Sequence, residues 1–224
     1  MKKLNMVFIT GAGISHSSGL PLYTYAEVTS AQPEVVGLGR DDCPSTVFEC
    51  LNARLKQVQQ ATPSDAHYLI AELQNYYNVQ VITQNVDDLH ERAGANNVTH
   101  VHGRLGTYRT TGKCCYLEGD KVAMRAGKKC EHGSYWRHDV ILYGEPVERF
   151  EEARRFLALA DILIVVGCSM LTNTGPNLVK LVGEYCPVYF INPHPHIIPD
   201  GVNVIRQTAY AGIWTALSDI CSAE

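Results

Sequence analysis

Residues 83–94, TQNVDDLHERAG, hold an unusual density of polar side chains. Five of them fall directly after the apolar run VQVIT: Gln84, Asn85, Asp87, Asp88 and His90. Amides and carboxylates in this order can orient a polar ligand or help a reaction that moves protons. A helix cap is the plainer interpretation, since Asn85 or Asp87 could cap the helix that follows, but a cap explains only one of these residues.

A second motif, FITGAGISHSSGLP, lies near the start of the chain. Gly11 and Gly13 follow an apolar run, and glycines there allow a tight turn whose backbone N–H groups can meet a pyrophosphate. His16 stands where a third glycine would complete the dinucleotide fingerprint, and the acidic residue expected about 20 positions later has no convincing candidate. The motif leaves a phosphate site and a ligand-free turn open, and it argues against an ordinary hydride-transfer dehydrogenase.

The third motif is VTHVHGRLG, in which His102 precedes Gly103. A histidine at the end of a strand can act as a general base near neutral pH, although a lone histidine is more often structural. His100 would point the same way as His102 in a regularly alternating strand, so the spacing does not choose between them.

Short apolar runs rich in β-branched residues predict the strands that carry these motifs. They are residues 6–10, 79–83, 98–102, 139–143, 161–167 and 188–192, with a weaker run at 202–205. Helical patterns fall between them, at residues 45–60, 64–76, 146–160, 176–185 and 210–221. Continuously apolar strands that alternate with helices predict an α/β fold with a doubly wound, parallel, Rossmann-like sheet. Ligands bind at the C-terminal strand ends of such sheets, so the three motifs would share one crevice.

Two segments break the alternation and predict a small inserted lobe. We expect one domain over residues 1–224, in which the lobe comprises about 22–60 and 104–138 and the Rossmann-like core comprises the rest: about 1–21, 61–103 and 139–224.

Composition narrows the class of protein. Hydrophobic residues make up 46% of the chain and charged residues 19%, which suits a packed globular domain. The formal net charge is −4 without a long basic run, so we expect no nucleic-acid partner. No apolar stretch approaches the ~20 residues of a membrane span, and the first residues do not fit a signal peptide. We therefore expect no membrane partner and a cytoplasmic protein.

These motifs together resemble the sirtuins, the NAD-dependent protein deacylase family. GAGIS…SGLP, TQNVDDLHERAG, VHG, DVILYGE, GCSM and FIN recur in family order across nearly the whole chain, and the second of them is the most specific. The resemblance implies that His102 is the general base and that Asn85 and Asp87 act with it. The residues it implies for NAD binding are Gly11, Ala12, Gly13, Ser15, Tyr23, Gln84, Asn85, Asp87, Gly167, Cys168, Ser169 and Asn192. Those it implies for gripping the acyl-lysine protein or peptide are Arg54, Val140, Ile141, Tyr143, Gly144 and Glu145.

The implied reaction needs no serine or cysteine nucleophile. In sirtuins the acyl oxygen attacks C1′ of the nicotinamide ribose, nicotinamide leaves, and the acyl group moves to the sugar to give O-acyl-ADP-ribose. Here the family's aromatic and arginine after SGLP are replaced by Tyr23 and Thr24, and Thr24 has no guanidinium. Two alternatives stay open: an NAD glycohydrolase or ADP-ribosyltransferase, and a non-catalytic NAD or ADP-ribose sensor. Arg54 matches half of the family's Tyr-x-x-Arg signature for acidic acyl groups, but Leu51 replaces the tyrosine.

The family's zinc motif, two C-x₂-C pairs, is altered in the predicted lobe. Four candidate ligands remain: Cys114, Cys115, Cys130 and His132. Because Cys114 and Cys115 are adjacent, we expect them to chelate one ion awkwardly, and both a zinc-bound and a zinc-free lobe stay open.

Overall fold

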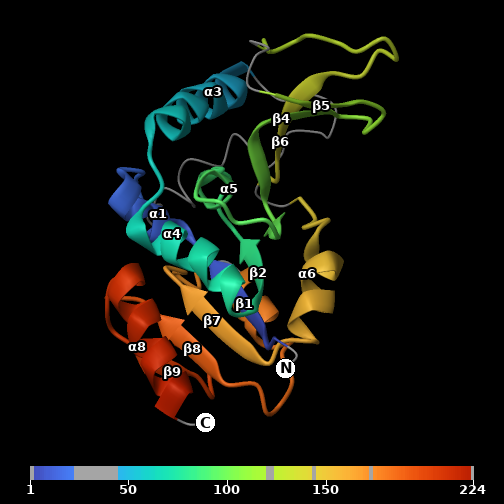
Figure 1. The fold of residues 1–224 in the computed structure, drawn as a ribbon. Coiled ribbons are helices and arrows are strands. Elements are labelled where there is room, and N and C mark those ends of the chain that lie inside the picture. Colours follow the sequence, from blue (N-terminus) through green and yellow to red (C-terminus); the bar gives the residue numbers. More distant parts are fainter. Residues whose placement is uncertain (1–2, 23–44, 120–123, 143–144, 172–173, 223–224) are drawn as a thin grey trace.

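Figure 1 shows the computed structural model of the chain, which describes residues 3–22, 45–119, 124–142, 145–171 and 174–222. The large sheet has the strand order β3-β2-β1-β7-β8-β9. Its strands are β1 (Asn5–Thr10), β2 (Asn78–Thr83), β3 (Val98–His100), β7 (Ile162–Val166), β8 (Val188–Ile191) and β9 (Asn203–Ile205). All neighbouring pairs are parallel. This doubly wound sheet confirms the predicted fold class.

The two faces of the sheet are covered by different helices. Met6 and Phe8 of β1 pack into one core cluster and Val7 and Ile9 into another, because neighbouring strand residues point to opposite faces. The first cluster includes residues of α4 (Asp65–Glu72) and α8 (Ala209–Ser222), and the second includes residues of α6 (Phe150–Leu157) and α7 (Thr174–Val179). Figure 1 shows α4 and α8 on the side of the sheet away from α6. None of the described helices is long and apolar enough to cross a membrane.

The small lobe is built on the antiparallel sheet β5-β4-β6. It contains β4 (Gly103–Thr110), β5 (Tyr116–Glu118), β6 (Trp136–Val140) and the long helix α3 (Ser45–Gln60), which lies beside this sheet in Figure 1. Phe48 of α3, Tyr108 and Met124 form its core. A separate cluster that includes Leu20, Leu89 and Val140 packs β6 of the lobe against segments that follow β1 and β2.

Two predicted strands need correction. The strand expected at 98–102 ends at His100, and Val101 and His102 form a turn. Gly103 then adopts φ +79°, and a Cβ there would lie 1.9 Å from the carbonyl oxygen of Asp139, so the chain leaves the large sheet at this glycine.

The run expected at 139–143 does not belong to the parallel sheet. It contributes only its first two residues to β6, which begins at Trp136 and pairs antiparallel with β4. Arg137 and Asp139 of β6 are buried, and each forms an ion pair. A search for apolar runs does not detect a strand whose buried residues are charged. The segment 104–138, expected as a polar insertion, holds most of this sheet.

Candidate active site

The centre of the site is the point where β1 and β7 lie side by side and the chain's winding direction reverses. The backbone N–H of Gly11 donates to the carbonyl of Val166 at 3.0 Å, and that of Gly13 donates to the carbonyl of Gly167 at 2.9 Å. A Cβ on Gly13 would lie 2.6 Å from the Cα of Gly167, whose own φ is +63°. Glycine is therefore required here so that the two turns can touch, a reason the sequence alone did not supply.

The polar residues after β2 join this turn through side-chain hydrogen bonds. The Nδ2 of Asn85 donates to the carbonyl of Gly11 at 3.1 Å and to the Oγ of Ser15 at 3.0 Å. Ser15 in turn donates to the Oδ2 of Asp87 at 3.0 Å. All three side chains are buried, so the first two motifs form one polar cluster, which we call the Ser15–Asn85–Asp87 cluster.

Neither Asn85 nor Asp87 is the N-cap residue of the helix that follows, which is Asp88, but Asp87 binds a backbone N–H at the start of that helix. The Oδ1 of Asp87 accepts the backbone N–H of Leu89, the first residue of α5 (Leu89–Arg92), at 3.3 Å. Burial raises the pKa of the Asp87 carboxyl, and the hydrogen bonds from Leu89 and Ser15 oppose this rise. Asp87 thus serves α5 and the crevice together, whereas Asn85 faces Gly11 and Ser15.

His102 lies in the turn after β3, between the end of β2 and the start of α7. Its Nδ1 is 3.0 Å from the carbonyl oxygen of Gln84, and its Nε2 is 3.2 Å from the hydroxyl oxygen of Thr174. A carbonyl only accepts, so Nδ1 carries the proton and Nε2 offers a lone pair. Burial lowers the pKa of His102, and the hydrogen bond to Gln84 raises it less, so the ring is neutral at pH 7.

His100 has different surroundings, and the structure separates the two histidines that their spacing could not. Its Nε2 is 2.7 Å from the carboxylate of Glu91 and its Nδ1 is 3.1 Å from the carbonyl oxygen of Asn85. It also lines a polar cavity of about 210 Å³ together with Arg104 and Asp139, which is not the crevice at Gly11. His100 holds β3 to the segment after β2.

The segment after β7 closes another side of the crevice. The Nδ2 of Asn192 donates to the carbonyl of Cys168 at 3.0 Å, and the Nε2 of Gln84 donates to the sulfur of Cys168 at 3.5 Å. Burial raises the pKa of the Cys168 thiol to about 12, so it is no nucleophile at neutral pH. Ser169 is exposed, and Met170 beside it has a φ of +58°. Ala12 begins the short helix α1 (Ala12–Ser15), directly after Gly11.

The turn expected to grip a substrate is held by Glu145, which the sequence analysis named, and by Arg137, which it did not. Arg137 donates to both carboxylate oxygens of Glu145, at 2.5 and 3.0 Å, and to the carbonyl of Val140 at 3.0 Å. Glu145 also accepts the backbone N–H of Leu142 at 2.8 Å. The backbone N–H of Ile141 donates to the carbonyl of His102 at 2.8 Å, so this turn adjoins the histidine. The available signal in the sequence was Arg137 itself, which lies two residues before the apolar run at 139–143.

Three expected site residues, Tyr23, Tyr143 and Gly144, lie outside the described residues. Arg54 lies on α3, where its guanidinium donates to Gln57 at 3.1 Å and to the carbonyl of Pro21 at 3.5 Å. Leu51 packs beside the cluster that includes Val140, which places this part of α3 next to the turn that follows β6.

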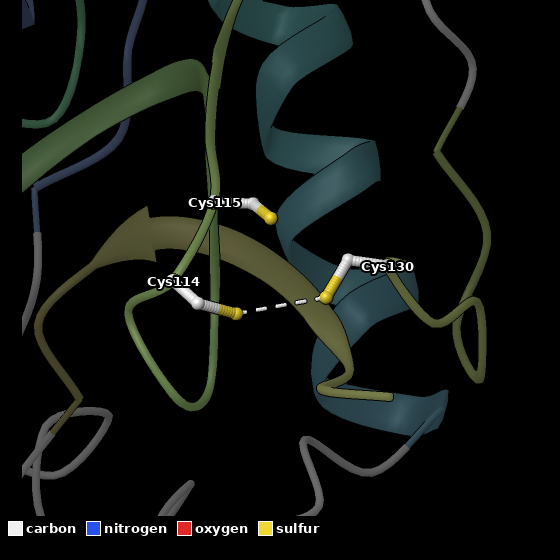
Figure 2. Close-up of side chains that lie close together, drawn as sticks. All are labelled: Cys114, Cys115 and Cys130. Carbon is white, nitrogen blue, oxygen red and sulfur yellow. Dashed lines mark hydrogen bonds between the residues drawn. The ribbon is translucent and has the colours of Figure 1, made fainter. Parts of the chain in front are cut away.

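The three cysteines of the small lobe lie together. Figure 2 shows Cys114 and Cys115, from the loop between β4 and β5, pointing toward Cys130. The sulfurs of Cys114 and Cys130 are 3.6 Å apart, and all three sulfurs lie within 4.8 Å of one another. Sulfurs on one tetrahedral zinc ion are about 3.8 Å apart, so the three thiols fit one face of a zinc site.

The fourth expected ligand, His132, is close to only one of these cysteines. Its ligand atom groups with Cys115 and Glu131 within 4.8 Å and not with the other two thiols. The adjacency of Cys114 and Cys115 therefore does not keep their sulfurs apart, and the fourth position is the weaker part of the donor set.

Residues 11–173 match the model of the Sir2 family. The chain belongs to the Sir2 family. This confirms the resemblance to the sirtuins. A sirtuin from Bacteroides thetaiotaomicron, named NAD-dependent protein deacylase, is 34% identical over 93% of this chain and 94% of its own length. Another of that name, from Thermococcus kodakarensis, is 38% identical over 80% of this chain and 75% of its own. A solved Sir2 homologue–NAD complex is 31% identical with a TM-score of 0.78, covering 99% of this chain and 91% of that chain.

Proposed function

We propose that this chain is an NAD-dependent protein-lysine deacylase, a deacetylase in the simplest case, that releases nicotinamide and O-acyl-ADP-ribose. The observation that carries the proposal is the Ser15–Asn85–Asp87 cluster, which links the glycine turn of β1 to the segment after β2 at the switch point of the sheet. The names of the sirtuin relatives and the solved complex with NAD support it.

NAD would lie across the strand ends and supply both the electrophilic ribose carbon and the hydroxyl that accepts the acyl group. We assign its pyrophosphate to the turn around Gly11, Ala12 and Gly13. The remaining assigned contacts are Ser15, Tyr23, Gln84, Asn85, Asp87, Gly167, Cys168, Ser169 and Asn192. The buried hydrogen bonds among Gly11, Asn85 and Ser15 make this wall rigid before a ligand arrives, which favours binding.

His102 would remove a proton through the ribose hydroxyls. Its neutral ring carries the Nε2 lone pair that a general base needs, and the carbonyl of Gln84 fixes its tautomer. The carboxylate of Asp87 and the amide of Asn85 would orient the nicotinamide ribose. No thiolate is needed, in agreement with the burial and raised pKa of Cys168.

The acyl-lysine protein or peptide would bind along Val140, Ile141 and Glu145, together with Tyr143 and Gly144. The support is the position of this turn beside His102 and its two links to Arg137. Arg54, with Leu51 beside it, would border the acyl group.

A zinc ion, if bound, would be held by Cys114, Cys115 and Cys130 and would fasten the two loops of the small lobe, without a part in the chemistry. His132 would complete the donor set. We also infer a cytoplasmic location, because the cysteines among the described residues are free thiols, as expected in a reducing compartment. Cell fractionation that recovers the protein outside the cytoplasm would contradict this.

Nicotinamide release by the purified protein, with NAD and with or without an acetyl-lysine peptide, tests the proposal. Release that depends on the peptide, with formation of O-acetyl-ADP-ribose, is the expected result. Release without the peptide would point to a glycohydrolase or ADP-ribosyltransferase instead. No release together with measurable NAD binding would point to a sensor.

A further inference from the structure

The ring of His102 has two hydrogen-bond partners, one at each nitrogen. The hydrogen on Nδ1 goes to the carbonyl of Gln84, so Nε2 is an acceptor. The hydroxyl of Thr174 is 3.2 Å from Nε2 and must therefore donate its hydrogen to this lone pair. The oxygen of Thr174 keeps its lone pairs when it donates this hydrogen, so it can still act as an acceptor.

The position of Thr174 is fixed by the packing of its neighbour. Thr174 is the first residue of α7, and Gly175 follows it in close contact with two side chains. A Cβ on Gly175 would lie 3.0 Å from the sulfur of Met170 and 3.3 Å from the Nε2 of Gln84. The start of α7 is thus held against the same residue, Gln84, whose carbonyl binds the other side of the His102 ring.

We propose that Thr174 is a positioning residue for the reaction, which holds the Nε2 atom of His102 in the crevice by donating its hydroxyl hydrogen to it. The inference rests on the proposed role of His102 as the general base. A hydrogen bond to the lone pair stabilises the neutral ring, so it weakens the hold of Nε2 on a proton. Thr174 would keep the ring neutral and aimed until a substrate hydroxyl takes its place.

The effect of Thr174 on the pKa of His102 can be measured without interference from charged neighbours. Asp87 and Cys168 are titratable side chains of the crevice, and His100, at the end of β3, faces the separate polar cavity. None of them contributes to the lowered pKa of His102 among the described residues, for which burial is the largest cause. A change at Thr174 would therefore act on the ring directly and not through a charged neighbour.

The test replaces Thr174 by valine, which keeps the shape and removes the hydroxyl, and by serine, which keeps the hydroxyl. The pKa of His102 is followed by NMR titration of its imidazole hydrogens, with the His102→Gln protein to assign the signal. Loss of one neutral hydrogen bond should raise this pKa by about 0.5 to 1 unit in Thr174→Val. Thr174→Ser should keep the wild-type value. Thr215→Val, on α8, is the matched control for the substitution itself.

The second readout is the pH dependence of kcat/KM for deacylation. Its acidic limb should move to higher pH in Thr174→Val by the same amount as the NMR pKa, and kcat should fall several-fold. Unchanged pKa and unchanged profile in Thr174→Val would overturn the proposal, and so would equal changes in the valine and serine proteins. A pKa that moves while the rate profile stays fixed would support Thr174 as the partner of His102 and overturn His102 as the base.

Discussion

Ser15 donates its hydroxyl hydrogen to the buried carboxylate of Asp87 over 3.0 Å, which joins two motifs that lie far apart in the sequence. Ser15 belongs to the short helix after the glycine turn of β1, and Asp87 belongs to the polar segment after β2. This contact makes one wall out of the two strand ends on which we place NAD.

Replacing Ser15 by alanine should weaken NAD binding by about tenfold, since it removes a donor from a buried carboxylate and from Asn85 its acceptor. The pKa of Asp87 should rise further at the same time, because the hydrogen bond from Ser15 lowers it. Calorimetric titration with NAD measures the affinity. Ser18→Ala is the matched control, because its hydroxyl is buried and makes no hydrogen bond within the described residues. Equal affinity in both variants would exclude a role of the Ser15–Asp87 contact.

Acid should destabilise the protein partly through His67, the third residue of α4. Burial lowers the pKa of His67 from 6.5 to about 4 in the folded state. The unfolded chain therefore binds this proton first as the pH falls, so folding stability is lost between about pH 6.5 and 4. The loss amounts to roughly 3 kcal/mol for this one group.

His67→Gln should make this loss of stability shallower. Nδ1 of His67 accepts the backbone N–H of Ser64 at 3.1 Å in a capping box, and glutamine is a usual residue at that place. Urea unfolding at a series of pH values measures the slope. His196→Gln, an exposed histidine, is the control and should follow the wild type. Parallel curves for all three proteins would show that His67 is not protonated on unfolding.

Arg137→Gln should raise the KM for the acyl-lysine peptide by about tenfold and change NAD affinity little. The variant loses the paired hydrogen bonds that hold Glu145 and the carbonyl of Val140. Steady-state kinetics with varied peptide gives the KM. Arg154→Gln removes an exposed pair with Glu151 and should leave the KM unchanged. A KM that stays at the wild-type value in Arg137→Gln would place the peptide elsewhere.

The preference for one acyl group over another should depend on Leu51 and Arg54 of α3, which stand in place of the family's Tyr-x-x-Arg signature. Arg54 supplies a positive charge, but Leu51 cannot donate a second hydrogen bond, so we expect weak or absent preference for succinyl over acetyl. Leu51→Tyr should raise the ratio of succinyl to acetyl activity. Rates on the two acyl peptides measure it, with Arg54→Ala as the control. A large succinyl preference in the wild type that Arg54→Ala abolishes would show that Leu51 is no obstacle.

The sequence predicted the large sheet because its strands are continuously apolar, as β7 shows with ILIVV. It did not predict β4 and β6, whose buried residues include Arg109, Arg137 and Asp139 paired with one another or with neighbouring charges. Such pairs depend on partners from distant segments, which a local pattern of hydrophobicity does not contain.

The site residues likewise divide into those that a local pattern predicted and those that depend on contacts between distant segments. The glycines and the polar segment were found from their residue types, but the contact that requires Gly13 to be glycine is with Gly167, 154 positions later. The choice between His100 and His102 was likewise open, because it depends on the turn that ends β3. Thr174 gave no signal in the sequence, since its role depends on a ring from another segment.

The central claim is that His102 is the general base of an NAD-dependent deacylation, and its most direct test is the deacylation rate of His102→Ala with NAD affinity measured on the same protein. Loss of a general base typically lowers the rate about 10²–10⁴-fold. We predict a fall of that size with NAD affinity near wild type and a folded protein by its melting temperature. His100→Ala should instead lower the melting temperature, since His100 binds Glu91 and Asn85, and should reduce the rate much less. A His102→Ala protein that deacylates at the wild-type rate would contradict the account.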